Sequence, residues 1–140
     1  MSELIVALDG MASDKALKVA GDLSHLQTNG LWGFKIGHSL TFAGAEWIKE
    51  LKTFGKVFVD LKLYDIPNTV ENAVAWLSSL NVDLATVHLS MGRSTIEKIA
   101  DKGVGILGVS LLTSAILDEC HRIYGGSRSE EHTSELQSQP

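Results

Sequence analysis

Short apolar segments recur along the chain and alternate with longer stretches whose apolar residues are spaced like one face of a helix. The segments are rich in β-branched residues and too short for helices, which is typical of strands covered on both faces. The intervening spacing is helical, as at Leu17, Ala20, Leu23 and Leu26. The pattern predicts strand–helix units of roughly 20–28 residues that build a parallel sheet. The predicted strands are residues 4–8, 32–36, 57–63, 84–89 and 105–112.

Polar residues that commonly cap helices predict where several of the helices begin. Ser13 and Asn68 are the expected N-caps of two helices, and Ser94-Thr-Ile-Glu97 has the spacing of a capping box. One further helix is expected over residues 41–54.

Polar side chains recur at the C-terminal ends of the predicted strands. That recurrence is typical of a (β/α) barrel, whose active site lies at this edge, while no Gly-rich nucleotide-binding loop follows the first strand. We therefore predict an α/β fold, namely about the first five βα units of an incomplete (β/α)8 TIM barrel. A complete barrel has eight units and about 250 residues. The polar residues are Asp9, Lys35, Asp60 with Lys62, His88 with Ser90, and Thr113 with Ser114.

The residues after position 127 are polar and aperiodic, unlike everything before them. A disordered tail is the ordinary interpretation of such a composition. We favour another, because residues 128–138 match what a widely used sequencing adapter encodes when it is translated in frame. We expect residues 1–127 to be the N-terminal part of the barrel domain and residues 128–140 to be a non-native tail. Resequencing the gene without adapter-derived reads tests this.

Composition excludes several classes of function. A formal net charge of −5, with no basic stripe, argues against a nucleic-acid-binding surface. The single cysteine, Cys120, excludes an intrachain disulfide framework and a Cys-rich metal site. The N-terminal apolar segment is too short for a signal peptide or a membrane span. A cytoplasmic protein without membrane association is the expectation.

Charged side chains interrupt an otherwise apolar strand at residues 60–65, and this stretch is the most informative in the chain. Alternation along a strand places Asp60 and Lys62 on one face, and Asp65 follows the strand. A surface ion pair on an edge strand is the ordinary alternative, but the flanking apolar residues favour an interior strand. Lys35, at the end of the preceding strand, would complete a charge quartet that keeps Lys62 protonated and Asp60 ionised.

Other polar residues at the same edge have two interpretations each. Asp9 is either a turn cap or a carboxylate suited to ribose hydroxyls, and His88 is either a core histidine or a substrate contact. Thr113 and Ser114 would donate hydrogen bonds to a substrate or cap a helix. No second His or Cys lies at metal-ligand spacing, so a zinc site is not predicted.

These residues resemble the signature of the orotidine 5′-phosphate decarboxylase family. Residues 57–69 fit the family's Asp-x-Lys-x-x-Asp-Ile-Pro-x-Thr pattern at every position, and shorter matches lie at 7–9, 34–37, 87–92 and 112–114. The resemblance implies decarboxylation of orotidine 5′-monophosphate to uridine 5′-monophosphate, the last step of de novo UMP biosynthesis. It implies neither a metal nor an organic cofactor.

The resemblance also implies roles for individual residues. Asp60 would face the substrate carboxylate, and Lys62 would protonate C6 as carbon dioxide leaves. Asp9 and Lys35 would contact the ribose hydroxyls. The remaining implied contacts are Asp65 and Thr69, which would reach the neighbouring subunit's site in a homodimer, and Thr113 and Ser114, which would approach the pyrimidine.

Two other functions remain open. Magnesium-dependent sugar-phosphate decarboxylases and aldolases of the same superfamily share the Asp-x-Lys-x-x-Asp strand, but they carry an acidic metal ligand where this chain has Lys35. The chain could instead be a non-catalytic dimerising module. The family's phosphate-binding loops follow later strands, so we expect the chain as written to be inactive and poorly folded alone.

Overall fold

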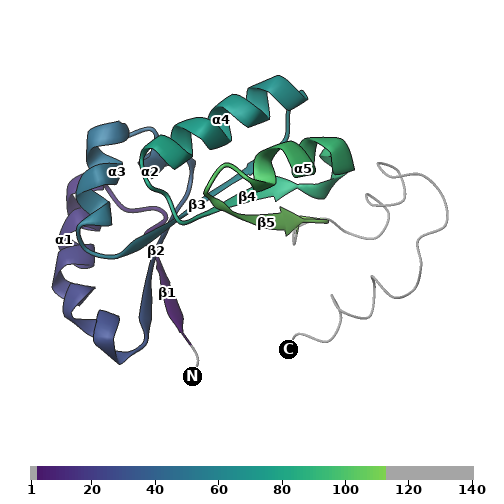
Figure 1. Ribbon diagram of the computed structural model, residues 1–140. Coiled ribbons are helices and arrows are strands. Elements are labelled where there is room, and N and C mark those ends of the chain that lie inside the picture. The colour runs from purple at the N-terminus through teal and green to yellow at the C-terminus, as the bar shows by residue number, and fades with distance from the viewer. Residues whose placement is uncertain (1–2, 113–140) are drawn as a thin grey trace. The chain divides into compact units, whose positions relative to one another are not determined.

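The computed structural model describes residues 3–112, within which five parallel strands form one sheet in the order β1-β2-β3-β4-β5 (Figure 1). This sequential order is that of a barrel wall, because the strand order of a doubly wound sheet reverses. The α/β fold and the five predicted strands are confirmed. The strands are β1 (Leu4–Ala7), β2 (Leu31–Ile36), β3 (Lys56–Leu63), β4 (Leu84–His88) and β5 (Gly105–Val109).

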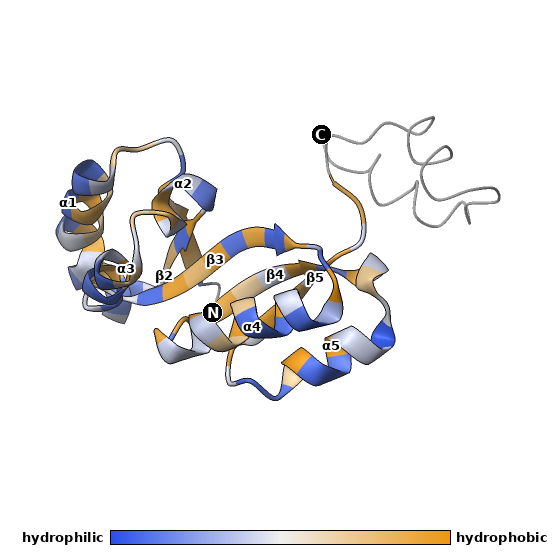
Figure 2. Ribbon diagram, turned by 90° about the horizontal axis from the view of Figure 1, so that it is seen from above, coloured by the Kyte–Doolittle hydropathy of each residue, from blue (hydrophilic) through white to orange (hydrophobic). Residues whose placement is uncertain are grey.

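Helices follow each of the first four strands and, as Figures 1 and 2 show, lie along one side of the sheet. None of the helices in residues 3–112 is long and apolar enough to cross a membrane. The α-helices are α1 (Ser13–Leu23), α2 (His38–Thr41), α3 (Ala45–Lys52), α4 (Pro67–Ser79) and α5 (Arg93–Ala100), with the 3-10 helices η1 (Ser24–Asn29) and η2 (Leu89–Met91).

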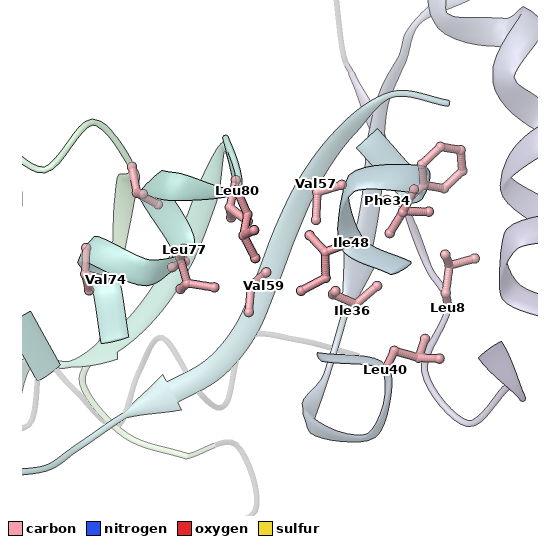
Figure 3. Packing of buried hydrophobic residues seen from close by; sticks show 14 of the residues in the cluster. Leu8, Phe34, Ile36, Leu40, Ile48, Val57, Val59, Val74, Leu77 and Leu80 are labelled. Carbon is pink, nitrogen blue, oxygen red and sulfur yellow. The ribbon is translucent and has the colours of Figure 1, made fainter. Parts of the chain in front are cut away.

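The hydrophobic core lies between the helices and the sheet face that they cover. Alternate strand residues supply one side of it, among them Ile36, Val57 and Val59, which are all fully buried. Figure 3 shows Val57 and Val59 flanked by Ile48 of α3 and Leu77 of α4. Burial of each such side chain contributes about 1.5–3 kcal/mol to folding, so this face anchors the sheet on its helices.

The other face of the sheet is apolar toward the N-terminal ends of the strands and polar toward their C-terminal ends. Ile5 of β1 and Leu107 of β5 are 38% and 42% exposed, respectively. Within residues 3–112 the structure places no helix over this face. It corresponds to the interior of a closed barrel.

The helices begin one or two residues away from where the capping pattern predicts. Ser13 is the first residue of α1, and the N-cap is Ala12, whose side chain makes no capping hydrogen bond. Helix α4 begins at Pro67, so the predicted cap Asn68 lies inside it. Proline suits the first helical turn because the N–H that it lacks would have no partner there.

The capping box and the single helix over residues 41–54 are also corrected by the structure. Helix α5 begins at Arg93, and its N-cap is Gly92, with φ of +87°, in place of Ser94. The helix predicted over residues 41–54 is the shorter α3, which begins only after Gly44 because that residue has φ of +103°, outside the helical region; α2 ends where the predicted helix begins.

Candidate active site

The carboxylate of Asp60 is the centre of a hydrogen-bonded charge cluster at the C-terminal ends of β1 to β4. Lys62 Nζ lies 2.9 Å from each of its carboxylate oxygens. Lys35 Nζ approaches Oδ2 at 3.4 Å, and Thr86 Oγ1 donates to Oδ1 at 2.8 Å. The Asp60 side chain is only 15% exposed, so these donors replace the water that it loses on folding.

Lys35 joins the two carboxylates of the cluster. Its Nζ lies 2.5 Å from Asp9 Oδ2 and 3.4 Å from Asp60 Oδ2. Burial lowers the pKa of Lys35, but the hydrogen bonds and negative charges of Asp9 and Asp60 outweigh it and raise the pKa above its ordinary value. The ammonium group therefore stays charged. No group of three or more His, Cys, Asp or Glu side chains in residues 3–112 converges as a metal site requires.

The ionised state of Asp60 follows from the same contacts. Burial raises the pKa of its carboxyl. The opposing effects are larger: Lys62 and Thr86 donate hydrogen bonds to the carboxylate, and Lys62 and Lys35 are positively charged. The net effect is a pKa below the ordinary value, so the cluster holds a fixed negative charge beside two ammonium groups.

The backbone of β3 is irregular where it carries these side chains. Val59 pairs with Ala85 and Leu63 pairs with Val87, so four residue steps of β3 face two steps of β4. Lys62, inside this bulge, has φ of +48°, a left-handed conformation that costs a non-glycine residue about 1–2 kcal/mol. Simple alternation predicts that Asp60 and Lys62 share a face of the sheet. Their side chains are in contact, but the backbone that carries them is a bulge and not a regular strand.

Thr86 holds the opposite side of the bulge and is the residue that sequence reasoning missed. Its hydroxyl accepts the backbone N–H of Lys62 at 2.8 Å and donates to Asp60. The side chain is 6% exposed. The signal that would have found it is alternation on β4, which places Thr86 on the same face as His88.

Asp65 and Thr69, which the sequence pattern includes, are not part of this cluster. Asp65 is exposed, and its Oδ1 accepts the N–H of Ile66 at 2.6 Å. Thr69 is exposed in the first turns of α4. The structure therefore brings together Asp9, Lys35, Asp60 and Lys62, while Asp65 and Thr69 make no hydrogen bond or ion pair with them in the described residues.

His88 lies at the end of β4, next to the cluster. Its side chain is 8% exposed, its ring centroid is 5.3 Å from that of Tyr64, and its Nδ1 has no hydrogen-bond partner among the described residues. Thr113 and Ser114 lie outside the described residues, as does the stretch 128–140.

Comparison with known proteins places the chain in a family. The family model described as "Orotidine 5'-phosphate decarboxylase / HUMPS family" matches residues 2–133. The chain belongs to this family. Its parallel α/β fold is the one expected of part of such a barrel.

Curated relatives and solved structures of the family are longer than this chain. An orotidine 5'-phosphate decarboxylase of Nautilia profundicola is 40% identical over 133 residues, which cover 89% of this chain and 57% of the relative. One of Carboxydothermus hydrogenoformans is 40% identical over 127 residues, covering 81% and 51%. The chain thus spans little more than half the length of these relatives.

The solved structures agree with the fold. The crystal structure of orotidine 5'-phosphate decarboxylase from Lactobacillus acidophilus matches with a TM-score of 0.74 and 31% identity, covering 97% of this chain and 65% of that one. The corresponding enzyme of Methanocaldococcus jannaschii matches with a TM-score of 0.67 and 29% identity, covering 77% and 54%.

Proposed function

We propose that this chain carries the reacting part of an active site that decarboxylates orotidine 5′-monophosphate to uridine 5′-monophosphate. The observation that carries the proposal is the contact of the Lys62 ammonium with the Asp60 carboxylate, 2.9 Å apart at the C-terminal end of a barrel strand. The names of the family's curated relatives support the choice of substrate.

The proposed chemistry is electrostatic and needs only these side chains. The Asp60 carboxylate would lie beside the carboxylate of the substrate and disfavour the bound ground state. When the bond between C6 and the carboxyl carbon breaks, carbon dioxide leaves and the electron pair stays on C6. The ammonium of Lys62, which is 41% exposed and within reach of a bound ligand, would stabilise that carbanion and then give it a proton. Solvent would reprotonate the neutral lysine.

Asp9 and Lys35 are proposed to bind the ribose hydroxyls. Asp9 is exposed at the end of β1, and Lys35 Nζ reaches both it and Asp60, so a ribose bound at Asp9 would lie next to the reacting group. The position of Lys35 between the two carboxylates also favours this function over the magnesium-dependent one, because a cation there opposes a bound dication.

We propose that the chain forms a homodimer in which Asp65 and Thr69 reach the active site of the neighbouring subunit. Both are exposed and, within residues 3–112, make no hydrogen bond or ion pair with the cluster of their own subunit, and the exposed apolar side chains of Tyr64 and Ile66 flank Asp65. Such a loop suits insertion into a second subunit, where the carboxylate would meet that subunit's charged groups. His88, Thr113 and Ser114 are retained as proposed substrate contacts.

The decisive experiment measures decarboxylation in a hybrid, because the chain spans little more than half of its relatives. Residues 1–112 are joined to the part of the Nautilia relative that follows the position aligned with residue 112. We expect carbon dioxide release from carboxyl-labelled orotidine 5′-monophosphate, with kcat/KM lowered about 10³-fold or more by Lys62→Ala. The control variant Lys49→Ala, on the exposed surface of α3, should leave the rate unchanged.

Three outcomes of this assay distinguish the alternatives. Equal activity of the Lys62→Ala and Lys49→Ala hybrids would contradict the assignment of Lys62. No release from orotidine 5′-monophosphate, together with turnover of a sugar phosphate that EDTA abolishes and Mg²⁺ restores, would support the magnesium-dependent chemistry. The 140-residue chain alone is expected to release no carbon dioxide, because one face of its sheet is left uncovered by residues 3–112.

A further inference from the structure

We propose that Thr86 is the positioning residue of the charge cluster: its hydroxyl couples the Asp60 carboxylate to the backbone of Lys62 and thereby sets the direction of the Lys62 ammonium. As a statement about the reaction this rests on the proposed function. The geometry that it concerns is measurable without substrate or turnover.

The first observation is that a single buried hydroxyl makes both contacts. Thr86 Oγ1 donates its one hydrogen to Asp60 Oδ1 at 2.8 Å and accepts the N–H of Lys62 at 2.8 Å. The two contacts differ in direction, so the hydroxyl satisfies both without conflict. With 6% of Thr86 exposed, water has little access to replace either contact.

The second observation is the irregular backbone that this hydroxyl spans. Lys62 has φ of +48°, which non-glycine residues rarely adopt, and it lies in the bulge between the pairs Val59–Ala85 and Leu63–Val87. Thr86 is the β4 residue between those two pairs. Its hydroxyl therefore takes the place of the ladder partner that the Lys62 N–H lacks in the bulge.

The third observation is that both ends of the Lys62 residue converge on Asp60. The Lys62 ammonium contacts Asp60 directly at 2.9 Å, and the Lys62 N–H reaches the same carboxylate through Thr86. The β-branched side chain of Thr86 has few rotamers in a strand, so its hydroxyl has a fixed direction. Serine keeps the hydroxyl with more freedom, and valine keeps the shape without the hydroxyl.

The test is NMR on the full 140-residue chain with Thr86→Val, Thr86→Ser and Thr41→Val. Thr41 is the matched control, since it is 5% exposed and its hydroxyl donates to Gly37 O at 2.8 Å, so its hydrogen bond involves neither Asp60 nor Lys62. The readouts are the Asp60 carboxyl titration followed by ¹³C shifts and the hydrogen exchange of the Lys62 amide. Among the described residues, the other titratable groups at this edge are Asp9 after β1, Lys35 of β2, Lys62 of β3 and His88 of β4, and their chemical shifts are followed in parallel.

Thr86→Val is expected to raise the Asp60 titration midpoint and to speed Lys62 amide exchange about 10-fold or more, while Thr86→Ser restores both in large part. Thr41→Val should change neither. An Asp60 midpoint that stays the same in Thr86→Val, or that moves equally in Thr41→Val, would overturn the proposal.

Two measurements that do not need the Thr86→Val variant also test the role of Thr86. In the folded wild-type chain, a slowly exchanging Thr86 hydroxyl proton should show a nuclear Overhauser effect to the Lys62 amide, and its absence would overturn the proposal. If the hybrid enzyme releases carbon dioxide but the Thr86 hydroxyl proton is not observed, the proposed function stands and the role of Thr86 is wrong. If the proton is observed but the hybrid enzyme releases no carbon dioxide, the proposed function is wrong and the coupling through Thr86 stands.

Discussion

At the scale of single residues, the site depends on how Asp60 keeps its charge in a partly buried position. Three side chains donate to its carboxylate, namely Lys35, Lys62 and Thr86. Removing one partner of a buried pair costs more than the pair contributes, because the remaining charge is left without compensation. The cluster is therefore expected to respond as a unit when any member is changed.

The acid sensitivity of the fold is the first prediction at this scale. Because the folded-state pKa of Asp60 lies below its unfolded value near 3.8, its contribution to stability is present above that value and is lost as pH falls through the folded pKa. Urea unfolding between about pH 5 and pH 2 should show a steep loss of stability in the wild type and a shallower one in Asp60→Asn.

Glu71→Gln is the comparison variant for this measurement. The hydrogen bond from Lys102 lowers the pKa of Glu71, but this pair is accessible to solvent, which screens it, so its substitution should flatten the acid limb less than Asp60→Asn does. Identical acid limbs in the wild type and Asp60→Asn would contradict the ionised, hydrogen-bonded state of Asp60.

Sequence reasoning reached part of this site. Period-2 alternation, together with the polar residues at strand ends, was enough to group Asp60 and Lys62 with Lys35 and Asp9. It did not predict the bulge at Lys62, because a left-handed lysine carries none of the Gly or Asn signals that usually mark such a backbone. Alternation on β4 places Thr86 on the same face as His88, but its contact with the Lys62 N–H arises only opposite the bulge, which the sequence does not signal.

At the scale of elements, the close contact of β2 with β3 explains why Gly33 lies within a strand. A Cβ added at Gly33 would lie 2.1 Å from the backbone oxygen of Lys56, an atom that the strand holds in place. Gly33→Ala should therefore lower the free energy of unfolding by about 1–3 kcal/mol or more in urea titrations.

Gly21→Ala provides the matched control for that experiment. Gly21 lies within α1, and a Cβ there would meet the Phe54 ring at 3.5 Å, an ordinary contact. Alanine within a helix is favoured over glycine by about 0.5–1 kcal/mol, so this variant should be as stable as the wild type or more so. A Gly33→Ala chain as stable as Gly21→Ala would contradict the close strand contact.

The element boundaries show where sequence patterns fail. Strand positions agree within three residues, as at β5, predicted to reach residue 112 and found to end at Val109. The first residues of the helices follow the geometry of the preceding loops and not the predicted polar caps. Helix α4 begins at Pro67, and α5 follows Gly92, which has positive φ. Capping preferences are worth only about 1 kcal/mol, which the packing of a βα loop easily overrides.

At the scale of the whole chain, the uncovered sheet face links the fold to the length of the family's enzymes. In residues 3–109 all helices pack on one face, and the apolar residues Ile5 and Leu107 remain exposed on the other. Solved structures of the family contain more residues than this chain, which covers 54% of the Methanocaldococcus enzyme. We expect the additional segment of such a relative to cover this face and turn the apolar residues into a barrel interior.

Thiol labelling tests that expectation. In a Cys120→Ser background, Leu107→Cys should react rapidly with a maleimide in the chain alone, and at least about 10-fold more slowly once the remaining segment of the Nautilia relative is supplied in trans. Trp76→Cys is the control, because Trp76 is equally exposed at 42% but lies on α4, on the helical side of the sheet. Its labelling rate should stay constant, since the added strands would cover only the other face. Equal protection at both positions would indicate nonspecific association, and protection at neither would show that the exposed face is not completed by these strands.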